Sequence, residues 1–222
     1  MQASHQKYKL NFKLPSGTSR GVLHNKETHF IKIRSEDRIG FGECAIFRGL
    51  SIDDRLDYTE KLDWLCKNIN REFDELWQQL EAFPSIQFGM EQALISYKSE
   101  SPFNLFPSKF TDYKEGIPIN GLIWMGEASF MKAQIQNKLK AGFTTLKMKI
   151  GAIDFETELA LLKGIRKEFS TSEITLRVDA NGAFQVKDAL EKLKTLSDLE
   201  IHSIEQPIKQ GQYDEMAALC EK

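Results

Sequence analysis

The sequence contains little cysteine: its 222 residues include only Cys44, Cys66 and Cys220. These three lie far apart and are odd in number, which argues against a disulfide framework and against a CxxC zinc site. The four histidines also lack metal-ligand spacing to one another. We therefore expect a protein of a reducing compartment, with no zinc site built from these residues.

Long apolar runs and an excess of charge of one sign are also missing. No run approaches the ~18–20 apolar residues of a membrane span, and the opening MQASHQKYKL lacks the apolar core of an export signal. Thirty basic residues against 32 acidic ones leave a net charge of −2, which provides no global attraction to nucleic acid or to an anionic membrane. We expect a cytoplasmic protein that acts on a small molecule. Its oligomeric state is left open.

The first half of the chain has the pattern of a small α+β unit. Three segments alternate apolar and polar residues with the period of a β-strand: Tyr8–Leu14, His29–Arg34 and Ile39–Ala45. A cluster of turn residues at Pro15–Ser19 separates the first two, so an antiparallel meander is predicted. Apolar residues at helical spacing follow between about 51 and 82, and again at 90–97. Prolines near residues 101–116 indicate a linker, and we expect an α+β capping domain over residues 1–115.

From residue 117 onward, strands and helices alternate. Four apolar segments are predicted as strands: Ile117–Trp124, Thr144–Ile150, Ile174–Asp179 and Glu200–Glu205. Helical patterns lie between these strands, and a further helix begins at Tyr213. Asp154 should cap the second of the helices. Successive β-then-α units of ~25–32 residues indicate a parallel sheet of the TIM-barrel type. A doubly wound open sheet is the alternative, although no GxGxxG or GxxxxGK[ST] motif follows any strand. We expect residues 116–222 to form the first four β/α units of a TIM-type barrel.

Polar residues gather at the carboxyl ends of three of these strands. Lys147 and Lys149 share one face of their strand, Asp179 ends the next strand, and Glu205 ends the last. Each motif alone has a structural explanation, such as a solvated edge strand or a turn with a helix cap. Together they lie where barrel enzymes build their active sites, which is hard to attribute to chance.

The residue types suit one kind of chemistry. Asp179 and Glu205 are hard oxygen donors suited to Mg²⁺, with Mn²⁺ as a possible substitute. Asn181 could either add a metal ligand or contact a ligand residue from outside the coordination shell. A divalent cation beside lysines favours removal of a proton α to a carboxylate, because the cation stabilises the enediolate while a lysine takes the proton. A second lysine and a cation nearby both favour the neutral form that such a base needs. The substrate class predicted is therefore a small carboxylate.

These segments resemble the enolase superfamily, and more narrowly its muconate-lactonizing-enzyme subgroup. The motifs that carry the resemblance are LKMKIG at 146–151, LRVDANGAF at 176–184 and IEQP at 204–207. Upstream segments look like the family's capping domain and first barrel strand, the latter most similar to o-succinylbenzoate synthases: GECA at 42–45, RGLS at 48–51, FGMEQAL at 88–94 and IPINGLIW at 117–124. The resemblance covers nearly the whole chain.

The resemblance implies a role for each residue at the strand ends. Lys149 would be the general base and then the general acid, and Lys147 would support it and contact the substrate carboxylate. Asp179 and Glu205 would be the first two Mg²⁺ ligands. Arg177 would either contact a ligand residue from outside the coordination shell or orient the substrate. The implied reaction is the syn dehydration of a succinyl-hydroxycyclohexadiene carboxylate to 2-succinylbenzoate, in menaquinone biosynthesis.

The resemblance also implies that loops of the capping domain shape specificity. These are the segments Ser16–Gly21 and Phe47–Ser51, with Ser19, Arg48 and Leu50 as substrate-binding residues. An N-acylamino acid racemase or a dipeptide epimerase of the same subgroup is the alternative, because these enzymes share the same lysines and carboxylates.

One feature departs from the family pattern. Lys149 and Asp179 are 30 positions apart, and Asp179 and Glu205 are 26 apart, so the family's third carboxylate should fall a little past about residue 225. The chain ends at Lys222, and the family's lysine on the sixth barrel strand would lie further still. We therefore expect an incomplete barrel and, for the 222 residues alone, an inactive half-barrel as a further alternative.

Overall fold

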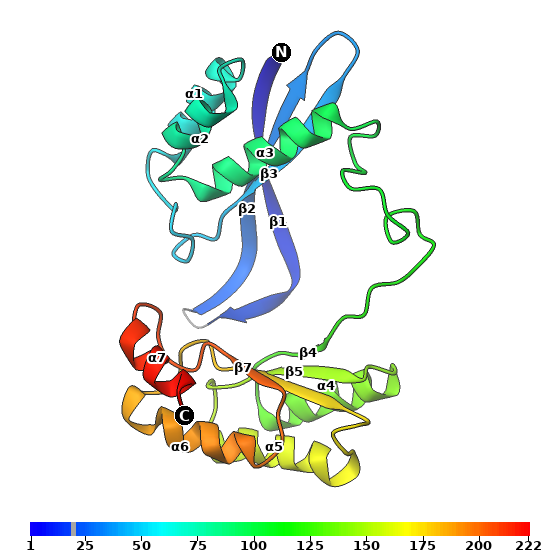
Figure 1. Cartoon of the computed structure of the whole chain (residues 1–222), viewed down its shortest axis with the longest axis vertical. Helices are drawn as coiled ribbons and strands as arrows, with labels where there is room; N and C mark the ends of the chain where they lie inside the picture. Colours follow the sequence, from blue (N-terminus) through cyan, green and yellow to red (C-terminus); the bar gives the residue numbers. More distant parts are fainter. Residues whose placement is uncertain (19–20) are drawn as a thin grey trace. The chain divides into compact units, whose positions relative to one another are not determined.

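A computed structural model describes residues 1–18 and 21–222 of the chain. The described chain folds as two compact units, Met1–Ile117 and Pro118–Lys222, each with its own buried apolar cluster. Figure 1 shows the strands and helices that make up each unit.

The first unit is built on a three-stranded antiparallel sheet in the order β1-β2-β3. Its strands are β1 (Gln2–Thr18), β2 (Gly21–Arg34) and β3 (Ile39–Ala45). The predicted meander is confirmed, but the turn predicted at Pro15–Ser19 is wrong for residues 15–18, which lie in β1. The pairing of β1 with β2 shifts register between Asn11 and Ser16, and Pro15, which has no N–H to donate, lies in this irregular stretch.

Three helices complete the first unit: α1 (Tyr58–Asn68), α2 (Phe73–Gln79) and α3 (Pro84–Lys98). The helical pattern between residues 51 and 82 therefore divides into two short helices. Helix α3 crosses the sheet at β3 (Figure 1) and approaches it very closely. A Cβ atom on Gly42 would lie 1.8 Å from the carbonyl oxygen of Gly89, so only glycine allows this contact.

The second unit is a four-stranded parallel sheet in the order β4-β5-β6-β7. The strands are β4 (Gly121–Ile123), β5 (Thr145–Lys149), β6 (Thr175–Asp179) and β7 (Ser203–Glu205). The helices between and after them are α4 (Ala128–Lys140), α5 (Phe155–Glu168), α6 (Val186–Ser197) and α7 (Tyr213–Cys220). The element order agrees with the predicted β/α alternation. Asp154 caps α5 as expected, accepting the backbone N–H of Thr157 at 3.1 Å.

Helices α4, α5 and α6 all lie on one face of this parallel sheet (Figure 1). Leu146, Met148, Leu176 and Val178 are buried beneath them, while Lys147 and Lys149 point to the opposite face. A doubly wound sheet would carry helices on both faces. Sequential strand order with one helical layer is the arrangement of a partial barrel, so the predicted fold class is confirmed.

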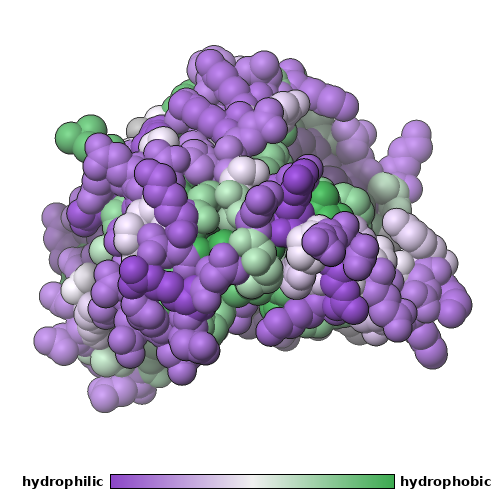
Figure 2. All heavy atoms as spheres, turned by 90° about the horizontal axis from the view of Figure 1, so that it is seen from above, coloured by the Kyte–Doolittle hydropathy of each residue, from purple (hydrophilic) through white to green (hydrophobic). Residues whose placement is uncertain are grey.

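The face of the molecule seen in Figure 2 is mostly hydrophilic, and hydrophobic residues show only in small areas. Across residues 1–18 and 21–222, no helix combines the length and the apolar character needed to cross a membrane.

Candidate active site

Three strand ends form one row across the parallel sheet. In the register of the sheet, Lys149 pairs with Asp179, and Asp179 pairs with Glu205. A second row lies two residues earlier and joins Lys147 to Arg177. Because side chains two positions apart in a strand share a face, both rows project from the face opposite the helices. The fold thus brings together residues 56 positions apart, from Lys149 to Glu205, as the spacing predicts.

Asp179 is at the centre of this cluster and is only 4% exposed. One of its oxygens, Oδ2, lies 2.9 Å from Lys149 Nζ and 3.5 Å from Lys147 Nζ. Burial opposes ionisation of this carboxyl, but hydrogen bonds from Lys149 and from the Asn181 backbone, with the charges of both lysines, lower its pKa overall. Asp179 is therefore a carboxylate at neutral pH.

Asn181 holds the other oxygen of Asp179. Its backbone N–H and its side-chain Nδ2 donate to Asp179 Oδ1 at 3.0 and 2.7 Å. Asn181 adopts a left-handed backbone with φ 48°, and Gln206, next to Glu205, does so with φ 44°. Such conformations cost energy in residues other than glycine and gather at functional sites.

Lys147 connects the two carboxylates. Its Nζ donates a hydrogen bond to Glu205 Oε2 as well as facing Asp179. The bond to Glu205 raises the pKa of Lys147, partial burial opposes this, and the charges of Asp179 and Glu205 add to the rise. Glu205 is far more open than Asp179, with 62% of its side chain exposed. Lys147 is therefore a charged bridge between a buried carboxylate and an exposed one.

Sequence reasoning missed Trp124, which lies next to Lys149, and Gln134, which holds Trp124. Trp124 directly follows β4, and its ring centroid lies 5.7 Å from Lys149 Nζ, within reach of a cation–π contact. Gln134 on α4 fixes this position through two bonds to the Trp124 backbone, at 3.0 and 3.1 Å. The available signal was an aromatic residue at the carboxyl end of a predicted barrel strand.

Comparison with known proteins places the chain in a family. The chain is 41% identical, over 251 aligned residues, to o-succinylbenzoate synthase of Desulfotalea psychrophila; the match covers 99% of this chain and 68% of that protein. Residues 131–222 match the family described as enolase C-terminal domain-like. The chain belongs to the enolase superfamily.

Other members of the superfamily agree in fold. The crystal structure of MenC from Desulfotalea psychrophila superposes with a TM-score of 0.83 at 36% identity, covering all of this chain and 68% of that one. Hydrophobic dipeptide epimerase of Enterococcus faecalis is 26% identical over 94% of this chain and 60% of its own length. A Mg-bound o-succinylbenzoate synthase structure from Thermosynechococcus elongatus has a TM-score of 0.77 at 22% identity, over all of this chain and 66% of that one. The chain thus spans about two thirds of the length of these relatives.

The residues present fit a superfamily metal ion only in part. Asp179 and Glu205 stand side by side in register and offer the hard oxygen atoms that Mg²⁺ prefers. The side chain of Asn181 is engaged with Asp179 and faces Lys149 Nζ at 3.4 Å, so its role as a ligand stays a prediction. Among the described residues, no three His, Cys, Asp or Glu side chains gather as a metal site. Asp179 and Glu205 are the two carboxylate donors that the described residues bring together here.

Arg177, the remaining strand residue of the predicted set, occupies the second row. Its Nη1 reaches Asn120 Oδ1 at 3.5 Å, while its Nε is buried without a hydrogen-bond partner. It lies on the same face as the lysines, two residues before Asp179. A role in orienting substrate stays a prediction.

The capping-domain residues of the predicted set belong to the first unit. Arg48 is held by two carboxylates of the first unit: its Nε lies 3.1 Å from Glu27 of β2, and its Nη1 lies 2.5 Å from Asp54. Leu50, in the same turn as Arg48, is half-buried. Ser19 lies outside the described residues. Substrate binding by these three residues stays a prediction.

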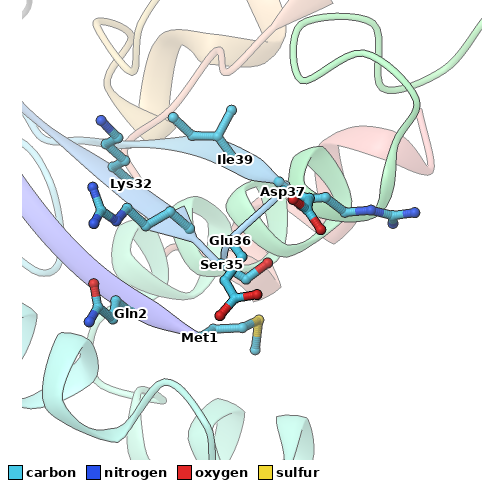
Figure 3. Close-up of a pocket in the computed structure, with 9 residues that line it drawn as sticks. Met1, Gln2, Lys32, Ser35, Glu36, Asp37 and Ile39 are labelled. Atoms are coloured by element: carbon cyan, nitrogen blue, oxygen red, sulfur yellow. The ribbon is translucent and has the colours of Figure 1, made fainter.

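A pocket on the first unit differs in its charges from the row of lysines and carboxylates (Figure 3). It is lined from the ends of β1, β2 and β3 by cations and anions in near balance: Lys32, Arg34, Arg38, Glu36 and Asp37, with Met1, Gln2, Ser35 and Ile39. None of the ion pairs found in the described chain links these five charged side chains to one another. A balanced and open pocket of this kind provides no arrangement comparable with the lysine and carboxylate row.

Proposed function

We propose that this chain belongs to a Mg²⁺-dependent carbon–oxygen lyase of the o-succinylbenzoate synthase type. The observation that carries the proposal is the row of Lys149, Asp179 and Glu205 at the carboxyl ends of adjacent parallel strands. The 41% identity to a relative named o-succinylbenzoate synthase supports the choice of reaction. The substrate would be a succinyl-hydroxycyclohexadiene carboxylate, and the product 2-succinylbenzoate, in menaquinone biosynthesis.

In this proposal Lys149 moves the proton. Acting as the base, its Nζ accepts the proton from the carbon α to the carboxylate, and the C–H electron pair becomes the new ring double bond. The same Nζ then donates that proton to the hydroxyl group leaving the neighbouring carbon on the same face, so water departs and the amine is regenerated. Lys147, 23% exposed at its side chain, is placed to contact the substrate carboxylate.

Asp179 and Glu205 would hold the metal ion. Mg²⁺, when bound, supplies positive charge opposite the negative charge that develops on the substrate carboxylate. Asn181 keeps Asp179 oriented through two hydrogen bonds to Oδ1. The Mg-bound o-succinylbenzoate synthase of similar fold supports the choice of metal, and Mn²⁺ is the expected substitute.

Epimerisation of a dipeptide is the second candidate, supported by the similarity to the hydrophobic dipeptide epimerase of Enterococcus faecalis. Both reactions begin with removal of an α-proton, so Lys149, Asp179 and Glu205 serve either one. An N-acylamino acid racemase would share the same first step. The two reactions therefore differ in the substrate and in the fate of the deprotonated intermediate, which either loses water or is reprotonated.

The test incubates the product of the complete reading frame, and separately the 222-residue chain, with Mg²⁺ in D₂O. One sample receives the cyclohexadiene substrate and is followed for 2-succinylbenzoate by absorbance. The other receives hydrophobic dipeptides and is followed for deuterium at the α-carbon by NMR. We expect dehydration by the product of the complete reading frame and none by the 222-residue chain, because the described residues of this chain bring together only two carboxylate ligands.

The variant Lys149→Ala should lower turnover about 10²–10⁴-fold, the usual contribution of a general acid–base. Lys140→Ala, at an exposed lysine of α4, is the matched control and should leave turnover unchanged. Deuterium in the dipeptides without dehydration would favour the epimerase. Normal turnover by Lys149→Ala would refute the assigned base.

A further inference from the structure

Helix α5 contains a buried carboxylate that the proposed reaction does not use. Glu158 is 1% exposed, and among the described residues no cation pairs with it. Its carboxylate instead accepts backbone N–H groups of the loop after β5. Gly151 donates to both oxygens, at 2.9 and 2.8 Å, while Ala152 and Ile153 donate to Oε1 at 3.3 and 3.4 Å.

Burial of a carboxylate without a cation beside it costs free energy of folding, which is unexpected for a residue without a role. Burial raises the pKa of Glu158, although the three backbone donors act in the opposite direction. Residues 151–153 begin two positions after Lys149, at the carboxyl end of its strand. The carboxylate thus binds the backbone of the first turn in the loop that follows the proposed base.

The same loop is packed against the turn after Asp179. Gly151 has φ 93°, and a Cβ atom there would lie 2.3 Å from Ala183 Cβ and 3.2 Å from the carbonyl oxygen of Ala180. Immediately before it, the Ile150 N–H donates to the backbone oxygen of Asp179 at 2.8 Å. A displacement of residues 151–153 would therefore also displace the ends of strands β5 and β6.

We propose that Glu158 is a positioning residue whose carboxylate fixes the 151–153 loop and thereby holds Lys149 in place against Asp179. Its catalytic consequence rests on the proposed function, because it concerns the same base. Its structural consequence does not depend on any substrate. The two can therefore be tested separately.

The first test measures amide hydrogen exchange in Glu158→Ala and Glu158→Gln. Loss of the carboxylate should speed exchange of the 151–153 amides about tenfold or more in Glu158→Ala, and less in Glu158→Gln, which keeps one acceptor oxygen. The amides of Leu176 and Val178 in β6 should not change, which would show that the variant remains folded. Glu156→Gln, at an exposed glutamate of the same helix, is the matched control. Unchanged exchange at 151–153 in Glu158→Ala would overturn the proposal.

The second test measures the accessibility of Lys149 by its rate of acetylation, read by mass spectrometry, without substrate or metal. Its side chain is 18% exposed and paired with Asp179, so loosening of the loop should raise the rate in Glu158→Ala, with the rate at Lys140 as internal reference. An unchanged rate at Lys149 would show that Glu158 orders the loop without positioning the base, against the proposal.

The third test compares kcat and KM of the unaltered enzyme, Glu158→Ala and Glu158→Gln, each made as the product of the complete reading frame. We expect kcat to fall up to ~100-fold in Glu158→Ala and less in Glu158→Gln, with KM changed little, because a misplaced base slows the chemical step. A purely structural role would lower the unfolding temperature and leave kcat intact well below it. Absence of turnover in the unaltered enzyme would refute the proposed function, and the exchange and acetylation results would still decide the role of Glu158.

Discussion

Lys149 Nζ lies 2.9 Å from Asp179 Oδ2, and the two residues occupy paired positions of neighbouring parallel strands. The backbone register, rather than the flexibility of the lysine, therefore sets this contact. A slip of one residue would turn either side chain to the helix-covered face. The candidate chemistry thus depends on the same pairing that buries Met148 and Val178.

Asp179→Asn should weaken Mg²⁺ binding about tenfold or more, because it removes the more buried of the two carboxylates. Isothermal titration calorimetry with Mg²⁺ alone gives the affinity, and circular dichroism checks that the variant is folded. Asp198→Asn, at an exposed aspartate after α6, is the control and should bind as the unaltered chain does. Equal affinity in Asp179→Asn would remove Asp179 from the proposed ligands.

His29 should make the first unit sensitive to acid. It is 2% exposed, neither ring nitrogen has a hydrogen-bond partner, and its ring lies 5.6 Å from that of Tyr58. Burial, with smaller contributions from nearby cations, lowers its pKa from 6.5 to about 4.

Because the unfolded chain takes up this proton at higher pH, the stabilisation present above pH 6.5 is lost as pH falls through 4. The loss is ~3 kcal/mol in the free energy of unfolding. Urea unfolding at pH 7 and pH 4.5 measures most of this loss, and His29→Leu should reduce the difference in unfolding free energy between the two pH values. His24→Leu, at an exposed histidine, should keep the full difference. Equal pH dependence in both variants would contradict the assignment.

Gly42→Ala should destabilise the first unit by about 3 kcal/mol, the upper range for overpacking, because the new methyl group meets the Gly89 backbone. Urea unfolding gives the change. Gly116→Ala is the matched control, since a Cβ there meets nothing within 4 Å, and should change stability by less than about 0.5 kcal/mol. A small effect at Gly42 would mean that α3 can move away from β3.

Asn181 offers a test of backbone strain at the site. Asn181→Gly loses the side-chain bond to Asp179, whereas Asn181→Ala loses it and keeps a left-handed backbone that alanine disfavours by ~1 kcal/mol. The glycine variant should therefore be the more stable of the two in urea unfolding. At Asn137, an exposed position within α4, the order should reverse, because glycine costs about 1 kcal/mol relative to alanine in a helix. An alanine variant as stable as, or more stable than, the glycine variant at position 181 would show that no strain is stored at Asn181.

Much of the second unit could be predicted because its signals are local. Alternation over Thr145–Lys149 and Thr175–Asp179 indicates strands with one apolar face, and Asp154 is a good helix cap. In a parallel sheet, residues at the same carboxyl edge come together once the strand order is sequential. Lys149, Asp179 and Glu205 could therefore be grouped from the sequence.

Other features could not be predicted from local pattern. The β1–β2 ribbon extends past Pro15, because long-range pairing resumes after a shift of register and outweighs the local turn preference. The close approach of α3 to β3 depends on Gly42 and Gly89, which are 47 positions apart. Trp124 and Gln134 could not be placed near Lys149 because their proximity depends on how α4 returns to its strand.

The order of strands, the faces of their side chains and the kind of chemistry at their ends follow from the sequence, because each depends on period, spacing and residue type. Tertiary structure alone decided which atoms meet: that Lys147 bridges Asp179 and Glu205, that Asn181 orients Asp179, and that Glu158 gathers the loop after Lys149. These contacts depend on strand register and on the burial of charge. Both are properties of the packed sheet and helices together, not of any one segment of the chain.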